Sequence, residues 1–274
     1  MIELPANFFF TAHTTLRCNF SCSYCIQRHD EYDKNTMFNL SELSTTEFID
    51  GLKNFKAPFL VISGGEVTIR NDAATIACGV ADNFSYIEIG TNLNKDPSTM
   101  IKEIIQAGKK NIKIGCSFHP EQVKNETMFL LHLKKIMNSP IELNVVAIVD
   151  TPDHKGEEAY KKFQQMGVPK LQLSPYQGFW KGDLYPKEFE EYGGRHDKKK
   201  CNCSSTIVAI SPNGNIYRCS HLLYLNSKHS MGNITNITTE NEQAIKDNII
   251  NGGYCDELGW CQPCNVYRIF PKAL

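Results

Sequence analysis

Six short β-rich runs alternate with amphipathic stretches of helical spacing along the first 175 residues. The expected strands are 8–16, 59–63, 86–91, 111–118, 142–149 and 170–174, and the expected helices are 45–55, 71–83, 98–107, 126–138 and 156–166. Strands joined through helices are parallel, with right-handed crossovers. Six units are too few for a closed eight-stranded barrel, so the alternation predicts an α/β fold, a partial (β/α)6 barrel.

Length and charge narrow the class of protein. A chain of 274 residues is long enough for one domain and an appendage, and we expect a barrel at 1–175, a linker at 176–200 and a small cysteine-rich β-hairpin/α module at 201–274. A net charge of -1 disfavours nucleic acid or an anionic membrane as the main partner. No apolar run approaches the ~18 residues of a membrane span, and the first residues do not form a signal peptide. These features predict a cytoplasmic protein.

Eleven cysteines are many for a reducing compartment, where disulfides are rare, and they indicate metal binding or redox chemistry. Cys78 and Cys116 stand alone in apolar stretches, where a cysteine usually serves as a small buried hydrophobe. The other nine form one group near each end of the chain.

Cys18, Cys22 and Cys25 form a C-x3-C-x2-C pattern directly after the first expected strand. Parallel β/α folds carry their chemistry at the carboxyl ends of the strands, so this loop lies on the expected active face. Three thiolates are one fewer than a structural zinc or an electron-transfer cluster requires. The pattern therefore predicts a metal site with one open position.

At these residues the sequence resembles the radical S-adenosylmethionine (SAM) superfamily. That family has C-x3-C-x2-C after the first strand of a partial (β/α)6 barrel, with an aromatic residue before the third cysteine, where Tyr24 stands here. Its second mark is Gly-Gly-Glu after the second strand, and Gly64-Gly65-Glu66 occupies that place.

The resemblance implies a [4Fe-4S] cluster on Cys18, Cys22 and Cys25, with its free iron chelated by the methionine end of SAM. It also implies reductive cleavage of SAM to a 5′-deoxyadenosyl radical that abstracts hydrogen from the substrate. An electron donor such as flavodoxin or ferredoxin is the implied partner. The residues expected to bind SAM are Tyr24, Gly64, Gly65, Glu66, Thr91, Asn92 and Ser117.

The second cysteine group follows residue 200. Residues 207–211, 212–214 and 216–218 are expected to form a strand, a turn and a returning strand. This hairpin would bring a cysteine at its start near Cys219, and Cys261 and Cys264 would complete a closed site of four thiolates. Zinc and [4Fe-4S] both satisfy such a site.

The spacing from Cys201 to Gly214 and Cys219, with the terminal C-x2-C, resembles the SPASM/Twitch extension of radical SAM enzymes. The resemblance implies one auxiliary [4Fe-4S] cluster, because the second run of cysteines of the full SPASM pattern is missing. Cys201 fits the usual spacing best, Cys203 is also acceptable, and Cys255 is a weaker candidate.

The sequence says less about the reaction. A short stub before Cys18 favours a small molecule, or a peptide delivered without a fused recognition domain. Dehydrogenation of a cyclitol or aminosugar-like alcohol is the leading hypothesis, because a closed auxiliary cluster suits electron transfer. Peptide crosslinking or epimerisation and sugar epimerisation are the alternatives. Strand-end residues expected to contact the substrate are His119, Glu121, Tyr176 and Trp180.

Overall fold

The computed structural model describes residues 1–25, 27, 37–176, 178–180, 183–185, 201–203, 206–225, 230–251 and 253–255. The strands are β1 (Ile2–Glu3), β2 (Phe9–Thr15), β3 (Phe55–Gly64), β4 (Phe84–Thr91), β5 (Ile112–Phe118), β6 (Leu143–Asp150), β7 (Leu171–Pro175), β8 (Gly178–Trp180), β9 (Asp183–Tyr185), β10 (Cys201–Cys203), β11 (Ile207–Ile210), β12 (Ile216–Tyr217) and β13 (Gly253–Cys255). The helices are α2 (Thr45–Leu52), α3 (Ala73–Gly79), α4 (Ser98–Ala107), α5 (Glu126–Met137), α6 (Lys155–Gln165), α8 (Ser220–Tyr224) and α9 (Glu242–Ile250), with 3-10 helices η2 (Val67–Ile69) and η3 (Ile234–Asn236).

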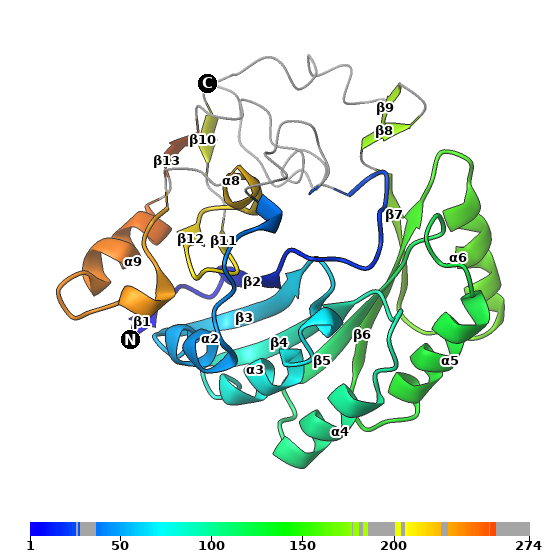
Figure 1. Ribbon diagram of the computed structural model, residues 1–274, viewed down its shortest axis with the longest axis horizontal. Coiled ribbons are helices and arrows are strands. Elements are labelled where there is room, and N and C mark those ends of the chain that lie inside the picture. The colour runs from blue at the N-terminus through cyan, green and yellow to red at the C-terminus, as the bar shows by residue number, and fades with distance from the viewer. Residues whose placement is uncertain are drawn as a thin grey trace.

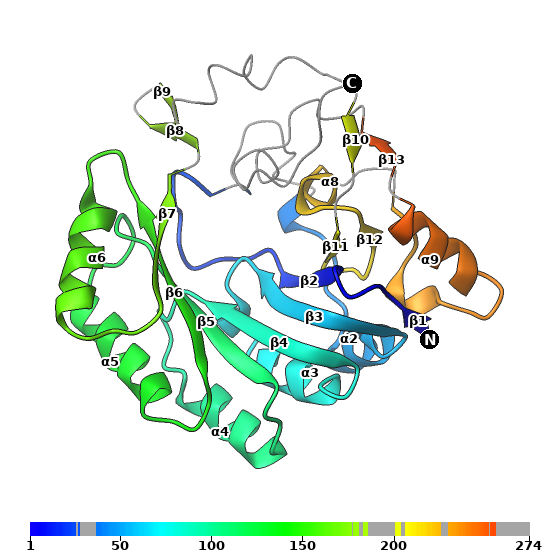
Figure 2. The ribbon, with the colours of Figure 1, turned by 180° about the vertical axis from the view of Figure 1, so that it is seen from behind.

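Strands β2 to β7 lie side by side in chain order, and every neighbouring pair among them is parallel. The sheet curves, and helices α2 to α6 line its outer, convex side (Figures 1 and 2). All six predicted strands and all five predicted helices are present, so the predicted α/β fold, a partial (β/α)6 barrel, is confirmed.

Apolar side chains on the outer face of the sheet explain this arrangement. Phe118 on β5 packs against Phe129 on α5 and Phe163 on α6, with each ring centroid 5.0 Å from that of Phe118. All three rings are buried. Burial of this stripe between sheet and helices drives the β/α units together, because each buried aromatic side chain contributes about 1.5–3 kcal/mol.

Local sequence sets where the helices begin and end. Ser44 is the N-cap of α2, and its hydroxyl accepts from the Glu47 backbone N–H while the Glu47 carboxylate accepts from that of Ser44. Gly108 ends α4 at φ 64°, a left-handed conformation that favours glycine.

The hairpin of β11 and β12 continues the barrel sheet. β11 pairs with β12 antiparallel, as predicted, and its other edge pairs with β2 in parallel. Within the predicted linker, β8 and β9 form a short antiparallel pair. The division of the chain into domains at residues 175 and 200 stays a prediction. In the described part of the chain, every helix is too short or too polar to cross a membrane.

Candidate active site at the carboxyl edge of the sheet

The segment that enters the cysteine loop lies directly on the glycine turn after β3. The Gly65 backbone N–H donates to the Thr15 carbonyl (2.8 Å), and that of Glu66 donates to the Arg17 carbonyl (2.8 Å). A Cβ on Gly64 would lie 2.0 Å from the Thr15 oxygen, and one on Gly65 would lie 2.0 Å from the Arg17 oxygen. Glycine is therefore required at both positions to hold the turn against the chain that leads to Cys18.

Arg70 fixes the same segment from the β3 side. Its buried guanidinium donates to the carbonyl of Thr14 (3.0 Å) and to the carbonyl of Leu43 (2.9 Å). It also forms a two-point contact with the Asp72 carboxylate at 3.0 and 2.7 Å. One buried cation thus joins the end of β2 to the loop that follows η2.

The three cysteines of the first group differ in exposure. Cys18 is exposed, Cys22 is buried and Cys25 is intermediate, and the Cys25 backbone N–H donates to the Cys22 carbonyl (3.2 Å). Burial, with smaller contributions from Cys25 and Cys18, raises the pKa of the Cys22 thiol to about 12.

Three thiols are a donor set that an iron-sulfur cluster can take. Among the described residues, no three His, Cys, Asp or Glu side chains are grouped to hold one metal ion. A cluster does not need such a group, because each thiolate binds an iron of its own. Three cysteines on one loop, one of them at the surface, are compatible with a [4Fe-4S] cluster that keeps one iron open.

The loop between β5 and α5 holds the cysteine loop from the opposite side. The Glu121 carboxylate accepts from the Ser23 backbone N–H (2.9 Å) and from the Ser23 hydroxyl (2.5 Å). The Gln122 side-chain oxygen accepts from the Ser21 backbone N–H (3.1 Å). Side chains after β5 thus satisfy the backbone donors between the cysteines and position the loop.

Tyr24, the aromatic residue before the third cysteine, also binds this region. Its hydroxyl lies 2.7 Å from Nδ1 of His119, whose Nε2 lies 2.8 Å from the Ser117 hydroxyl. Burial lowers the pKa of His119 to about 4, so the ring is neutral at pH 7. Tyr176 is 3% exposed, and its hydroxyl lies 2.7 Å from that of Ser23. The structure therefore gathers Tyr24, Ser117, His119 and Tyr176 around the cysteine loop.

Glu66 joins the ends of β3 and β4. One carboxylate oxygen accepts from the Thr68 N–H (3.1 Å), the Thr68 hydroxyl (2.6 Å) and the Thr91 hydroxyl (2.8 Å), and the other accepts from the Asn92 N–H (2.7 Å). Glu66 is only 2% exposed. The Asn92 side chain in turn donates to the Asn19 side-chain oxygen (2.8 Å), next to Cys18.

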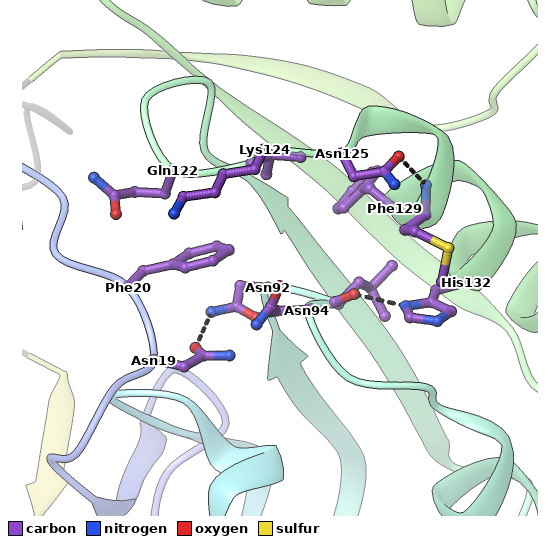
Figure 3. Close-up of a pocket in the computed structure, with 12 residues that line it drawn as sticks. Asn19, Phe20, Asn92, Asn94, Gln122, Lys124, Asn125, Phe129 and His132 are labelled. Atoms are coloured by element: carbon purple, nitrogen blue, oxygen red, sulfur yellow. Dashed lines mark hydrogen bonds between the residues drawn. The ribbon is translucent and has the colours of Figure 1, made fainter.

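A pocket of about 450 Å³ opens beside this contact (Figure 3). Polar side chains of Asn19, Asn92 and Gln122 line it together with the rings of Phe20 and Phe129. In Figure 3 the Lys124 side chain extends along one wall toward Phe20. The pocket therefore joins the cysteine loop to the loops that follow β4 and β5.

Sequence reasoning missed Lys124. Its ammonium has no hydrogen-bond or ion-pair partner within the described part of the chain. The signal was available, because Lys124 lies in the loop after the fourth expected strand, on the face where the chemistry of such folds is placed.

The second cysteine group is only partly described. Cys219 precedes α8 and is of intermediate exposure. β10 and β13 pair antiparallel, so that Cys201 is opposite Cys255 and Cys203 is opposite Gly253. Cys261 and Cys264 lie outside the described residues. Trp180 is the last residue of β8, and of its contacts only the backbone pairing with Asp183 is described.

Comparison with known families agrees with this site. Residues 13–140, from β2 to the end of the β5–α5 unit, match the model of the radical SAM superfamily. Over these residues, which make up slightly less than half of the chain, the protein is similar to the radical SAM superfamily, whose members use SAM and an iron-sulfur cluster.

Individual relatives are more distant. Fe-coproporphyrin III synthase of Methanosarcina barkeri (strain Fusaro / DSM 804) is 30% identical over 104 residues, 37% of this chain, and the match spans only a quarter (25%) of that protein. The structure of BtrN in complex with AdoMet and 2-DOIA aligns with a TM-score of 0.47 and 12% identity, covering 90% of this chain and 87% of that one. Streptococcus suis SuiB aligns with a TM-score of 0.46 and 12% identity, covering 89% and 66%.

Proposed function

We propose that this protein reductively cleaves SAM and uses the resulting radical to remove hydrogen from a small-molecule substrate. The observation that carries the proposal is the C-x3-C-x2-C loop at the carboxyl edge of the sheet, held between the glycine turn after β3 and the loop after β5. When bound, a [4Fe-4S] cluster and SAM would supply the electron and the 5′-deoxyadenosyl radical. Cys18, Cys22 and Cys25 are the residues that would hold the cluster.

The pocket beside the cysteine loop is the proposed binding site for the methionine end of SAM. That end carries an amino group and a carboxylate. The pocket is lined by the amides of Asn19 and Gln122, whose oxygens each already accept a hydrogen bond, and by Lys124, whose ammonium has no partner among the described residues. Asn92 lines the same pocket, and it was expected to meet SAM on sequence grounds alone. Lys124 would bind the SAM carboxylate by a charge-assisted hydrogen bond.

The neighbouring aromatic residues would exclude water and orient the reacting groups. Tyr24 and His119 are stacked, with ring centroids 5.8 Å apart, and Tyr24 meets Tyr176 edge to face at 5.2 Å. His119 and Tyr176 were expected to contact the substrate, and so was Glu121. All three residues contact the cysteine loop, through Ser23 or Tyr24. Their position supports contact with the substrate through atoms that do not bind Ser23 or Tyr24.

The second cysteine group favours a net oxidation. Removing two hydrogens from an alcohol requires an electron acceptor in addition to the radical. Cys219, with Cys201 or Cys203 and with Cys261 and Cys264, is the candidate to hold one as a Twitch-like auxiliary [4Fe-4S] cluster. On this basis we favour dehydrogenation of a cyclitol or aminosugar-like alcohol.

Two measurements test the proposal. Lys124→Met should weaken SAM binding about tenfold, equal to about 1.4 kcal/mol, in equilibrium dialysis of the anaerobically reconstituted protein. Lys134→Met, which removes an exposed lysine of α5, is the matched control and should bind SAM as the parent does. If both variants and the parent bind SAM with equal affinity, Lys124 does not bind SAM.

The product decides the reaction class. In deuterium oxide, a dehydrogenase releases a product two hydrogens lighter than the substrate, and that is the mass we expect. A product of unchanged formula that carries one deuterium would instead identify an epimerase. If only a peptide substrate is modified, the protein acts on peptides and the small-molecule assignment is wrong.

A further inference from the structure

The inner face of strands β4 to β6 remains accessible in the described part of the chain. Along β4 the outward residues Ile87 and Ile89 are fully buried, whereas Tyr86, Glu88 and Gly90 on the other face are partly exposed. β6 repeats the alternation. Helices α2 to α6 cover only the opposite, convex side (Figures 1 and 2). The described helices therefore leave the concave face uncovered.

Glu88 is a carboxylate in the middle of this face. The Tyr86 hydroxyl (3.3 Å) and the Asn144 amide both donate to its Oε2. Oε1 accepts no hydrogen bond from the described residues. A Cβ on Gly115 of β5 would lie 2.3 Å from that same Oε1. The absent side chain of Gly115 leaves room for this carboxylate oxygen.

The charge of Glu88 is also not compensated. Its partner in the parallel register is Lys113, which is the natural candidate for an ion pair. The Lys113 ammonium instead lies 2.8 Å from the Glu142 carboxylate and 5.0 Å from the centre of the Tyr86 ring. Within the described part of the chain, no cationic side chain pairs with Glu88. A carboxylate with an open oxygen in such surroundings favours a cationic hydrogen-bond donor.

An exposed aromatic ring lies on the same face. Phe59 on β3 is 43% exposed and packs edge to face on Tyr86, with centroids 5.7 Å apart. An exposed aromatic ring next to an open carboxylate suits a ligand with an apolar or carbocyclic body and a protonated amine. Asn92 directly follows β4 and lies four residues after Glu88, which corresponds to about 13 Å along an extended strand.

We propose that Glu88 binds a protonated amino group of the substrate on the concave face of the sheet, and so selects amines over neutral alcohols of the same shape. This proposal rests on the proposed function, since it names the substrate class of that site. The reacting carbon would then lie on the side of the amine that faces Asn92. Glu88 is in this account a specificity-determining residue and takes no part in the chemistry.

Matched probes test it on the anaerobically reconstituted protein. Ligand-observed NMR titrations at low ionic strength compare cyclohexylammonium with cyclohexanol, which differ in the charged donor. We expect the ammonium probe to bind at least tenfold more tightly than the alcohol. Glu88→Gln should remove this preference, and Glu158→Gln, the same change on an exposed residue of α6, should keep it.

A second variant keeps the proposal testable if Glu88→Gln does not fold. Gly115→Ala leaves the charge in place but brings a methyl group against Oε1, and it should reduce ammonium binding as Glu88→Gln does. Equal affinity of the parent for both probes, or an undiminished preference in both variants, would overturn the proposal. SAM cleavage by the parent is measured in parallel. If it is absent, the proposed function fails, while the titrations still decide the role of Glu88.

Discussion

Replacement of Glu66 by glutamine tests how the strand ends are held together. The carboxylate accepts four hydrogen bonds, three at one oxygen and one at the other. The best placement of an amide keeps its oxygen toward Thr68 and Thr91 and turns its NH2 group toward the Asn92 N–H. One hydrogen bond to a charged group is then lost, worth about 1.5–3 kcal/mol, and two donors face each other.

The loss can be measured as a melting temperature. For a chain of this size about 1 kcal/mol corresponds to about 2–4 °C, so Glu66→Gln should lower the Tm by about 3–12 °C. The control is Glu103→Gln, because within the described part of the chain that carboxylate accepts one hydrogen bond, an exposed 3.3 Å contact from Thr75 on α3. Its Tm should change by about 1 °C or less.

The same variant should bind SAM about tenfold more weakly, because Asn92 loses its anchor. The Tm is measured without SAM, so the two effects can be separated. An unchanged Tm together with weaker SAM binding would refute the reasoning, since it would show that Glu66 acts on SAM alone and does not position the end of β4.

Two further predictions concern buried charge and pH. Burial lowers the pKa of His13 and of His119 to about 4, below the ordinary value of about 6.5. The unfolded chain therefore binds protons first, and stability present above pH 6.5 should fall as the pH drops toward 4, by up to about 1.4 kcal/mol per pH unit and histidine. In urea titrations across this range, His119→Gln should show a shallower fall, and an unchanged slope would contradict the assignment. Arg70→Met should lower the free energy of unfolding by about 3 kcal/mol, because it removes the two-point contact with Asp72 and the hydrogen bonds to the carbonyls of Thr14 and Leu43. A Tm within about 2 °C of the parent would contradict that role.

The β/α order of the barrel could be predicted because it follows from the local spacing of apolar residues. On β4, Ile87 and Ile89 alternate with partly exposed residues, and this period follows directly from one buried face. Cys116 was expected to be buried, and it is 3% exposed on the helix-facing side of β5. Cys78 was expected to be buried too, and it is of intermediate exposure.

Contacts between distant segments could not be predicted in the same way. The glycines of the turn after β3 were expected to bind SAM, and that role stays a prediction. Their close approach to the carbonyls of Thr15 and Arg17 could not be predicted from the sequence. The parallel pairing of β11 with β2 likewise depends on which sheet edge is free, which no local pattern records. The Glu121 contact with Ser23 joins residues 98 positions apart, and only the fold brings them together.

Electron paramagnetic resonance of the reduced protein, with and without SAM, tests the central claim most directly. The account predicts about eight irons per chain after anaerobic reconstitution, for two [4Fe-4S] clusters, and a signal that shifts when SAM is added. Replacing Cys18, Cys22 and Cys25 together by alanine should halve the iron and abolish both the shift and 5′-deoxyadenosine formation. Cys78→Ala, at a cysteine outside both groups, should retain all three. Stoichiometric zinc with little iron, or a SAM-dependent signal that survives loss of the three cysteines, would contradict the account.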